Sequence, residues 1–301
     1  MASHRSELVI RTVCLALLLV ALTGAAPATG SFERGVREGR VYRVWVPARV
    51  QPGRPLVVAL HGCWQTPEDF ALGTRLNAAA EARGLVVVYP AQSQRANPYR
   101  CWNWFEPAQQ TASAGEPAEI LAIARAVQGE RGVKEPRVIV VGFSAGAWMA
   151  VNLVCAAPEA VLGLGAAAGG PYRCADGPEA AIQCMRGVPR EGGACAAGRA
   201  PLRVSLWQGG LDTVVSPANL TGLETMFGRV LGVSAGGTSP EAGAIHAVYR
   251  DRRGVPVLET WLVPGMGHAW SGGDARASHT WPPGPAATDR MLDFLLRGDA
   301  P

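Results

Sequence analysis

The amino-acid sequence predicts an α/β fold, in which one mostly parallel central sheet carries helices on both faces. Short apolar runs rich in valine and leucine alternate with longer segments of helical period, which is the pattern of repeated strand and helix units. No internal repeat and no linker divides the sequence, so we expect a single domain.

The apolar runs predict the strands of this sheet in chain order. They lie at Val41–Val46, Leu56–Leu60, Leu85–Tyr89, Arg137–Val141, Leu162–Ala168, Leu202–Trp207 and Leu258–Val263.

Helices are expected between these runs. One spans Phe70–Arg83 and ends at Gly84, because glycine tolerates the left-handed cap of a helix. Another begins at Glu116 with a proline in its first turn and stops near Gly132. A last amphipathic helix, at about Thr288–Arg297, closes the domain.

Three further segments depart from this alternation. Ala247–Arg250 and Val257–Val263 flank a polar turn, which predicts an antiparallel hairpin. Ala91–Gly115 and Gly169–Ala200 are expected to be long loops, and loops of this length are commonly functional or tied by disulfides.

The first residues have the layout of a secretory signal peptide. A basic start precedes an apolar run at Val13–Leu22 and a series of small residues. The run has about ten residues, whereas a spanning helix needs roughly 20, so an uncleaved anchor is the weaker alternative. We expect cleavage after Ala26 or Ala28. Removal of residues 1–28 leaves 301 − 28 = 273 residues, 29–301, as the catalytic domain, with no stable membrane insertion.

Composition narrows the partners and the compartment. The net charge is +4 and the arginines are scattered without a basic stripe, so nucleic acid is not an expected partner. Seven cysteines become six without Cys14, and an even set in an exported chain predicts disulfides. Their pairing stays open, and Cys155, in an apolar run, could equally be a buried thiol.

A nucleophile motif lies at Gly142-Phe143-Ser144-Ala145-Gly146. It fits the G-x-S-x-G elbow, in which a sharp turn from a strand to a helix projects a serine above a sheet. The strand before it and an apolar helical segment, Ala145–Ala156, come in the required order. This context predicts an α/β-hydrolase with Ser144 as its nucleophile.

A serine hydroxyl needs an imidazole to take its proton and a carboxylate to orient that imidazole. His268 follows the last strand in a glycine-rich turn and is the predicted base, with His279 as the fallback; His246 leads into a strand and is expected to be structural. Asp212 follows the strand Leu202–Trp207 and is the predicted orienting acid. The alternative for Asp212 is a turn aspartate that caps nearby amides.

Three other acids are weaker candidates for the orienting role because of where they lie. Glu224 and Glu259 fall in periodic segments, and Asp176 falls in the cysteine-rich loop.

Two backbone N–H groups are expected to receive the negative charge of the acyl transition state. One is Ala145, directly after the nucleophile. The other is Cys63, in the turn after the strand Leu56–Leu60. An ordinary strand-end turn at His61 and Gly62 is the alternative for that segment.

Several strings of this sequence resemble the polyhydroxybutyrate depolymerase-type esterases, which are related to feruloyl and acetylxylan esterases. The resemblance spans about Tyr42 to Leu296 and rests on four segments: Ala59–Gln65, Asn97–Phe105, Gly142–Gly146 and Gly267–Gly273. It implies the triad Ser144, Asp212 and His268, the oxyanion amides of Cys63 and Ala145, and a disulfide between Cys63 and Cys101.

The chain departs from this family pattern in two places. Gln208-Gly209-Gly210 stands where relatives often have His-Gly-Asp, and the segment Tyr172–Ala200 is unlike the simpler stretch expected there. Secreted depolymerases that attack solid polymer typically add a linker and a binding domain. The sequence shows neither, which favours smaller ester substrates.

Substrate contacts are predicted beside the oxyanion and base loops. Trp102, Trp104 and Trp270 could form an apolar wall or simply pack in the core, and Gln65 could orient the substrate or hold a turn. No zinc or phosphate motif is present, so neither a metal nor a cofactor is expected.

The predicted reaction is ester hydrolysis through an acyl-enzyme, on hydroxyalkanoate esters or oligomers. The alternatives are a feruloyl or acetylxylan carbohydrate esterase and, from another class, a secreted binding protein without catalysis.

Overall fold

The computed structural model describes residues 29–188, 193–196, 198, 201–233 and 237–297. The predicted signal peptide at residues 1–28 lies outside these ranges. Within them, no helix combines the length and the apolar character that crossing a membrane requires.

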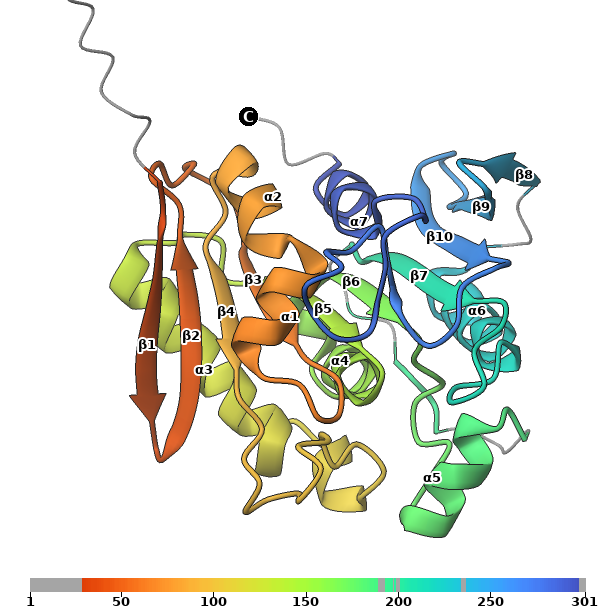
Figure 1. Cartoon of the computed structure of the whole chain (residues 1–301), viewed down its shortest axis with the longest axis horizontal. Coiled ribbons are helices and arrows are strands. Elements are labelled where there is room, and N and C mark those ends of the chain that lie inside the picture. The colour runs from red at the N-terminus through yellow and green to blue at the C-terminus, as the bar shows by residue number, and fades with distance from the viewer. Residues whose placement is uncertain (1–28, 189–192, 197, 199–200, 234–236, 298–301) are drawn as a thin grey trace, which may run out of the picture.

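A ten-stranded sheet runs through the whole molecule (Figure 1). Its strand order is β1-β2-β4-β3-β5-β6-β7-β10-β9-β8. The strands are β1 Ser31–Arg37, β2 Arg40–Val46, β3 Leu56–Leu60, β4 Val87–Pro90, β5 Val138–Phe143, β6 Val161–Ala167, β7 Arg203–Gly209, β8 Thr238–Glu241, β9 Ala244–Arg250 and β10 Pro256–Val263. The six strands from β4 to β10 pair in parallel, and the pairs at both edges are antiparallel.

Helices cover both faces of the sheet, as the sequence predicts. They are α1 Pro67–Thr74, α2 Leu76–Arg83, α3 Gly115–Arg131, α4 Ala145–Ala156, α5 Pro178–Met185, α6 Ala218–Leu231 and α7 Ala287–Leu295, with short 3-10 turns at Pro107–Gln110 and Pro158–Ala160. In Figure 1, α2 and α7 lie on one face, while α3 and α4 lie on the other. A small parallel pair, β11 Trp270–Ser271 and β12 Thr280–Trp281, stands apart from the main sheet.

The core lies between the helices and the middle strands. Every residue of β3, β5 and β6 is buried, which fits central strands covered on both faces. Gly165 in β6 lets α7 approach closely, because a Cβ there would stand 2.9 Å from the Met291 sulfur. The fold is therefore an α/β-hydrolase fold in which parallel strands point their carboxyl ends at one edge.

Two predicted elements need correction. The expected helix Phe70–Arg83 is broken at Arg75, which has a left-handed φ of 56°. At the break the Thr74 carbonyl accepts a hydrogen bond from the Thr288 hydroxyl of α7 at 2.5 Å, so a tertiary contact fixes the chain there. The expected loop Gly169–Ala200 contains α5, whose proline near the first turn is favourable at that position.

Other elements differ less from expectation. The strand predicted at Leu85–Tyr89 begins at Val87, and the edge strands β1 and β8 were not among the predicted runs. The predicted hairpin is confirmed as β9 and β10, joined by a turn in which the Asp251 amide donates to the Val255 carbonyl at 2.9 Å.

Three disulfides tie the loops to this framework. They join Cys63 to Cys101, the pair implied by the family resemblance, Cys155 to Cys195, and Cys174 to Cys184. The alternative of a free thiol at Cys155 is therefore wrong.

Candidate active site

Ser144 stands at a sharp turn between β5 and α4. Its φ of 53° is in the left-handed region, which is strained for a residue with a side chain and is retained where the surroundings enforce it. Two glycines allow the turn: a Cβ on Gly142 would overlap the Gly146 carbonyl, and one on Gly146 would overlap the Leu60 carbonyl. The chain therefore builds a tight elbow that presents the serine above the sheet.

The structure brings Ser144, His268 and Asp212 into one hydrogen-bonded chain. The Nε2 atom of His268 lies 3.0 Å from the Ser144 hydroxyl oxygen, and its Nδ1 atom lies 2.8 Å from an Asp212 carboxylate oxygen. A carboxylate can only accept, so Nδ1 carries the proton and donates it to Asp212. The lone pair of Nε2 is then directed at the serine O–H, which is the arrangement for proton transfer.

Asp212 is held as a buried carboxylate by several donors. One carboxylate oxygen accepts the amides of Val214 at 2.9 Å and Val215 at 2.8 Å, and the other accepts the Gln208 side-chain amide at 3.1 Å. Burial by itself raises the pKa of Asp212, but the His268 hydrogen bond and charge, together with the backbone amides of Val215 and Val214, outweigh it and lower the pKa. Asp212 thus caps its own turn and also orients the imidazole.

The neighbouring strands β7 and β10 bring the acid and the base together. Their parallel pairing ends at Gly209 beside Val263, so the loops that follow leave the sheet side by side. The Leu211 amide donates to the Met266 carbonyl at 2.9 Å, which ties one loop to the other. A Cβ on Gly209 would overlap the Met266 and Gly267 carbonyls, so this close approach requires glycine.

The amides of Cys63 and Ala145 lie on adjacent loops. Leu60 at the end of β3 pairs with Gly142 of β5, so the chain after each strand runs beside the other. The Gly62 amide is bound by the Gln65 side-chain oxygen at 2.9 Å, and the disulfide to Cys101 holds Cys63. Within the described residues, neither the Cys63 nor the Ala145 amide donates a hydrogen bond.

His61 supports this loop as a neutral imidazole. It is buried, and burial lowers its pKa to about 4, with the charges of Arg100 and Arg40 acting in the same direction. Its Nε2 atom accepts the Gln92 amide at 3.1 Å, so Nδ1 carries the proton and donates to the Gly62 carbonyl at 2.7 Å. The ring therefore braces, without a charge, the loop His61–Gln65, which we call the oxyanion loop after the role predicted for its Cys63 amide.

The tryptophans expected as a substrate wall are all buried. Trp102 donates to the His61 carbonyl at 3.0 Å, Trp104 stacks on Trp148 at 4.4 Å between ring centroids, and Trp270 donates to the Thr288 hydroxyl at 3.0 Å. These contacts match the alternative of core packing, in which the rings pack under the loops instead of facing a substrate.

Gln65 is also buried, and all of its hydrogen bonds are internal. Its amide nitrogen donates to Asp69 at 2.9 Å and to the Ser278 hydroxyl at 3.2 Å. These bonds fit the interpretation that Gln65 holds a turn better than the interpretation that it orients a substrate. The Asp69 and Ser278 pair joins the oxyanion loop to the segment near His279, and neither residue carries a sequence motif that could have revealed it.

The fallback base His279 lies beside the catalytic region but not on the serine. Its ring centroid is 5.9 Å from that of His268 and 5.8 Å from that of Phe143. Burial and the neighbouring His268 lower its pKa, so it is a neutral neighbour of the imidazole. No group of three or more metal-ligating side chains occurs in the part of the chain that the structure describes.

The fold and the loops at its carboxyl edge define an α/β-hydrolase, and comparisons with known proteins identify its family. Residues 41–248 match the family model described as Esterase PHB depolymerase, so the chain belongs to that family and is a carboxylic ester hydrolase. The chain is 31% identical to poly(3-hydroxyalkanoate) depolymerase C of Paucimonas lemoignei, over 89% of this chain and 68% of that protein.

Two more relatives extend the comparison. Feruloyl esterase B of Neurospora crassa is 29% identical, over 84% of this chain and 92% of that protein. The acetyl xylan esterase structure from Aspergillus awamori superposes with a TM-score of 0.72 at 18% identity, covering 90% of this chain and 100% of that one, which supports the fold alone.

Proposed function

We propose that this protein is an exported serine esterase in which Ser144 is the nucleophile, His268 the base and Asp212 the group that orients the base. The observation that carries the proposal is the continuous hydrogen-bonded chain from the Ser144 hydroxyl through both nitrogens of His268 to the buried Asp212 carboxylate. A serine hydroxyl becomes an effective nucleophile when an oriented imidazole takes its proton.

The reaction proceeds through an acyl-enzyme. The Ser144 oxygen bonds to the ester carbonyl carbon while its proton moves to Nε2 of His268. The amides of Cys63 and Ala145 receive the resulting oxyanion. When the tetrahedral intermediate collapses, the bond to the alcohol oxygen breaks and that oxygen takes the proton from Nε2. Water then repeats these steps on the acyl-enzyme, which releases the acid and restores Ser144.

Hydroxyalkanoate esters or oligomers are the substrates that we assign. The Paucimonas relative is named as a poly(3-hydroxyalkanoate) depolymerase, and the family model is that of the PHB depolymerases. The rings of Trp64 and Tyr99 are exposed, and their centroids are 4.9 Å apart. Trp64 follows Cys63 and Tyr99 precedes its disulfide partner Cys101, and the pair offers apolar surface to such a chain.

A carbohydrate esterase is the second candidate. It is favoured by the feruloyl esterase relative from Neurospora crassa, because the match covers 92% of that protein. Parallel assays of kcat/KM on hydroxybutyrate oligomers, polymer film, methyl ferulate and acetylated xylan decide between the two. We expect the hydroxybutyrate oligomers to be hydrolysed fastest, and a clear preference for methyl ferulate or acetylated xylan would reverse the assignment.

The serine mechanism is tested separately from the substrate. A fluorophosphonate probe should label the wild-type protein at one site and leave Ser144→Ala unlabelled, as read by mass spectrometry of the tryptic peptides. Absence of labelling in the wild type would favour a binding protein without catalysis.

Export and domain limits belong to the same proposal. Three disulfides are typical of an oxidising compartment, which supports export and a leader at residues 1–28. We assign residues 29–301 as the catalytic domain that remains. The mass of the protein recovered from outside the cytoplasm of an expressing cell should correspond to a chain that begins near residue 27 or 29.

A further inference from the structure

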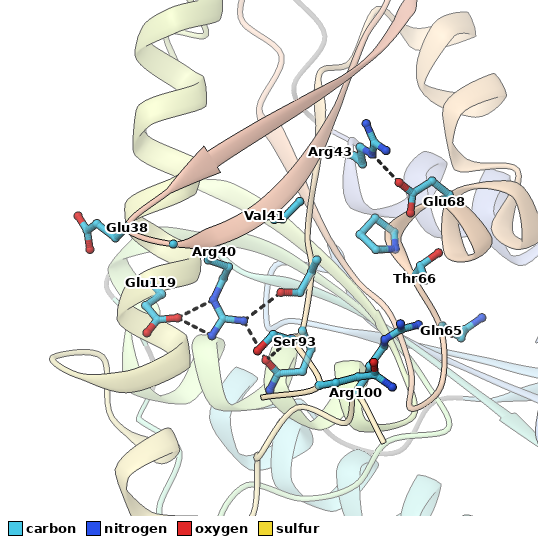
Figure 2. Close-up of a pocket in the computed structure, with 15 residues that line it drawn as sticks. Glu38, Arg40, Val41, Arg43, Gln65, Thr66, Glu68, Ser93, Arg100 and Glu119 are labelled. Carbon is cyan, nitrogen blue, oxygen red and sulfur yellow. Dashed lines mark hydrogen bonds and ion pairs between the residues drawn. The ribbon is translucent and has the colours of Figure 1, made fainter. Parts of the chain in front are cut away.

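A cavity of about 530 Å³, whose lining includes neither Ser144 nor His268, plays no part in the mechanism above. Its walls come from β2, from the start of α1 and from the segment after β4 (Figure 2). Cavities of roughly 300–1,000 Å³ are the usual size for small-molecule sites. Gln65, which binds the Gly62 amide, forms part of its wall, so the cavity shares that wall with the oxyanion loop.

Most charges of this cavity are already paired. Arg40 forms an ion pair with Glu119 at 2.5 Å and also donates to the Gln92 side chain at 3.0 Å. Arg43 forms an ion pair with Glu68, also at 2.5 Å. These pairs leave little net charge on the two walls that carry them.

Arg100 is the exception. It lies between Ser93 and Gln65 in Figure 2, and among the described residues its guanidinium has no hydrogen-bond or ion-pair partner. A guanidinium presents a planar fork of donors that matches a carboxylate with two parallel hydrogen bonds. A guanidinium without a protein partner on the wall of a cavity can therefore bind an anion.

The backbone holds Arg100 in a strained position. Its φ of 54° is in the left-handed region, and its amide donates to the Asn97 carbonyl at 2.9 Å. The Asn97 side-chain oxygen accepts the amides of Tyr99 and Cys101, and the disulfide from Cys101 to Cys63 anchors the segment. Strain of this kind persists where the surroundings fix it and is frequent at functional positions.

The surrounding groups select which anion is bound. The Arg100 guanidinium balances one negative charge, and Glu68 and Glu119 are already paired with arginines, so a group with a single negative charge is favoured. Side-chain amides and hydroxyls of Gln94, Ser93 and Thr66 complete the lining and offer hydrogen bonds to hydroxyl or ester oxygens. The ligand that these groups fit is a hydroxy acid or a short oligomer of one, with a free carboxylate.

We infer that this cavity is a subsite for the carboxylate end of hydroxy-acid chains and that Arg100 binds that carboxylate. The inference rests on the proposed function, because hydrolysis of hydroxyalkanoate oligomers both consumes chains with a free carboxylate and releases such acids. The carboxylate has two possible sources: the end of the oligomeric substrate and the acid product.

Two measurements distinguish these sources. In the first, 3-hydroxybutyrate is titrated into Ser144→Ala by calorimetry, which needs no turnover. In the second, KM is compared for the hydroxybutyrate trimer and its methyl ester, which lacks the charge. We expect a KM about tenfold lower for the free acid in the wild type, and Arg100→Gln should remove that difference.

Matched variants keep the result interpretable. Arg95→Gln removes an exposed guanidinium from the same segment but outside the cavity, and it should keep the wild-type KM ratio. Arg100→Lys retains the charge without the fork and should keep part of the discrimination. If Arg100→Gln does not fold, Arg100→Gly removes the guanidinium and also relieves the strained φ.

The KM ratio and the monomer affinity together distinguish the possible ligands. Discrimination of the trimers that depends on Arg100 identifies the substrate end, whereas monomer binding that depends on Arg100 without such discrimination identifies the product. A KM ratio and a monomer affinity that are both unchanged in Arg100→Gln overturn the inference. A wild-type protein that hydrolyses no trimer contradicts the proposed substrate, and the titration then decides the subsite alone.

Discussion

Two of the clusters in the described part of the chain, one around His268 and one around His246, combine a serine, a histidine and a carboxylate, but only His268 faces the serine hydroxyl. At the carboxyl edge of the sheet, His268 uses one nitrogen for Asp212 and directs the other at Ser144. The imidazole there has a partner that orients it and a partner from which it can take a proton.

The second cluster lies near the antiparallel edge of the sheet, on β7, β8, β9 and β10. Both nitrogens of His246 contact carboxylates, Glu241 at 2.9 Å and Glu259 at 3.0 Å, and its ring stacks on Trp261. The Ser205 hydroxyl donates to Glu259 at 2.7 Å and has no contact with the imidazole. The same residue types therefore form a structural ion pair instead of a nucleophile.

The difference teaches that the order of connection decides the chemistry. A serine bonded to the carboxylate cannot pass its proton to the imidazole, and an imidazole between two carboxylates is stabilised in its charged form. Burial alone lowers the pKa of His246, but the hydrogen bonds and charges of Glu259 and Glu241 outweigh it and raise the pKa.

The largest expected effect separates the two serines. Ser144→Ala should lower hydrolysis of a short-chain nitrophenyl ester by roughly 10⁴-fold or more, because the members of a triad act as a unit. Ser205→Ala should keep activity while lowering the free energy of unfolding by about 1–3 kcal/mol, since Glu259 and the Trp207 indole lose a partner. Comparable turnover by folded Ser144→Ala would contradict the assignment.

The second effect separates the two acids. Asp212→Asn should reduce kcat by roughly 10³- to 10⁴-fold, because an amide can donate to Nδ1 and so favours the wrong tautomer of His268. Glu259→Gln should leave kcat within a few-fold of wild type and act on stability, measured by urea unfolding. A similar loss of kcat in both variants would show that the two clusters are not functionally distinct.

The smallest effect is a pH dependence of stability that comes from His246. Its folded pKa is raised above the ordinary value of 6.5, so its stabilising charge is fully present below that value and is lost as pH rises through the folded pKa. Urea unfolding from pH 6 upward should show this decline.

The matched variant is His246→Gln, which should be about 2 kcal/mol less stable than wild type at pH 6. The difference between the two proteins should shrink with increasing pH. A constant difference over the whole range would argue against a charged His246.

The elements that local chemistry encodes were predicted correctly. The central strands are recognisable as apolar runs because they are buried on both faces. The elbow is recognisable as a motif because close contacts on either side of Ser144 require its two glycines. The hairpin after Ala244 was predicted equally well from its polar turn. In each case the local structure restricts which residue types can occupy the segment, so the sequence pattern predicts it.

Features that depend on contacts between residues far apart in the chain could not be predicted from the sequence. Helical period continues through Arg75, and the break there depends on Thr288 of α7. The tryptophans near the site could not be assigned from sequence, because a buried ring and a substrate-facing ring have the same local pattern. Arg100 lies in the segment Asn97–Phe105, but the family pattern assigns it no role, and the role that we infer depends on the cavity around it.

The sequence by itself determined the central strands of the sheet, the elbow and a candidate for each catalytic role, since these depend on the residue types along a short stretch. Only the tertiary structure decided which histidine meets the serine. The parallel pairing of β7 with β10 brings Asp212 and His268 together, while the antiparallel pairing of β9 with β10 places His246 beside Glu259. Strand order in the sheet is fixed by packing across the whole core, so no local segment could encode this choice.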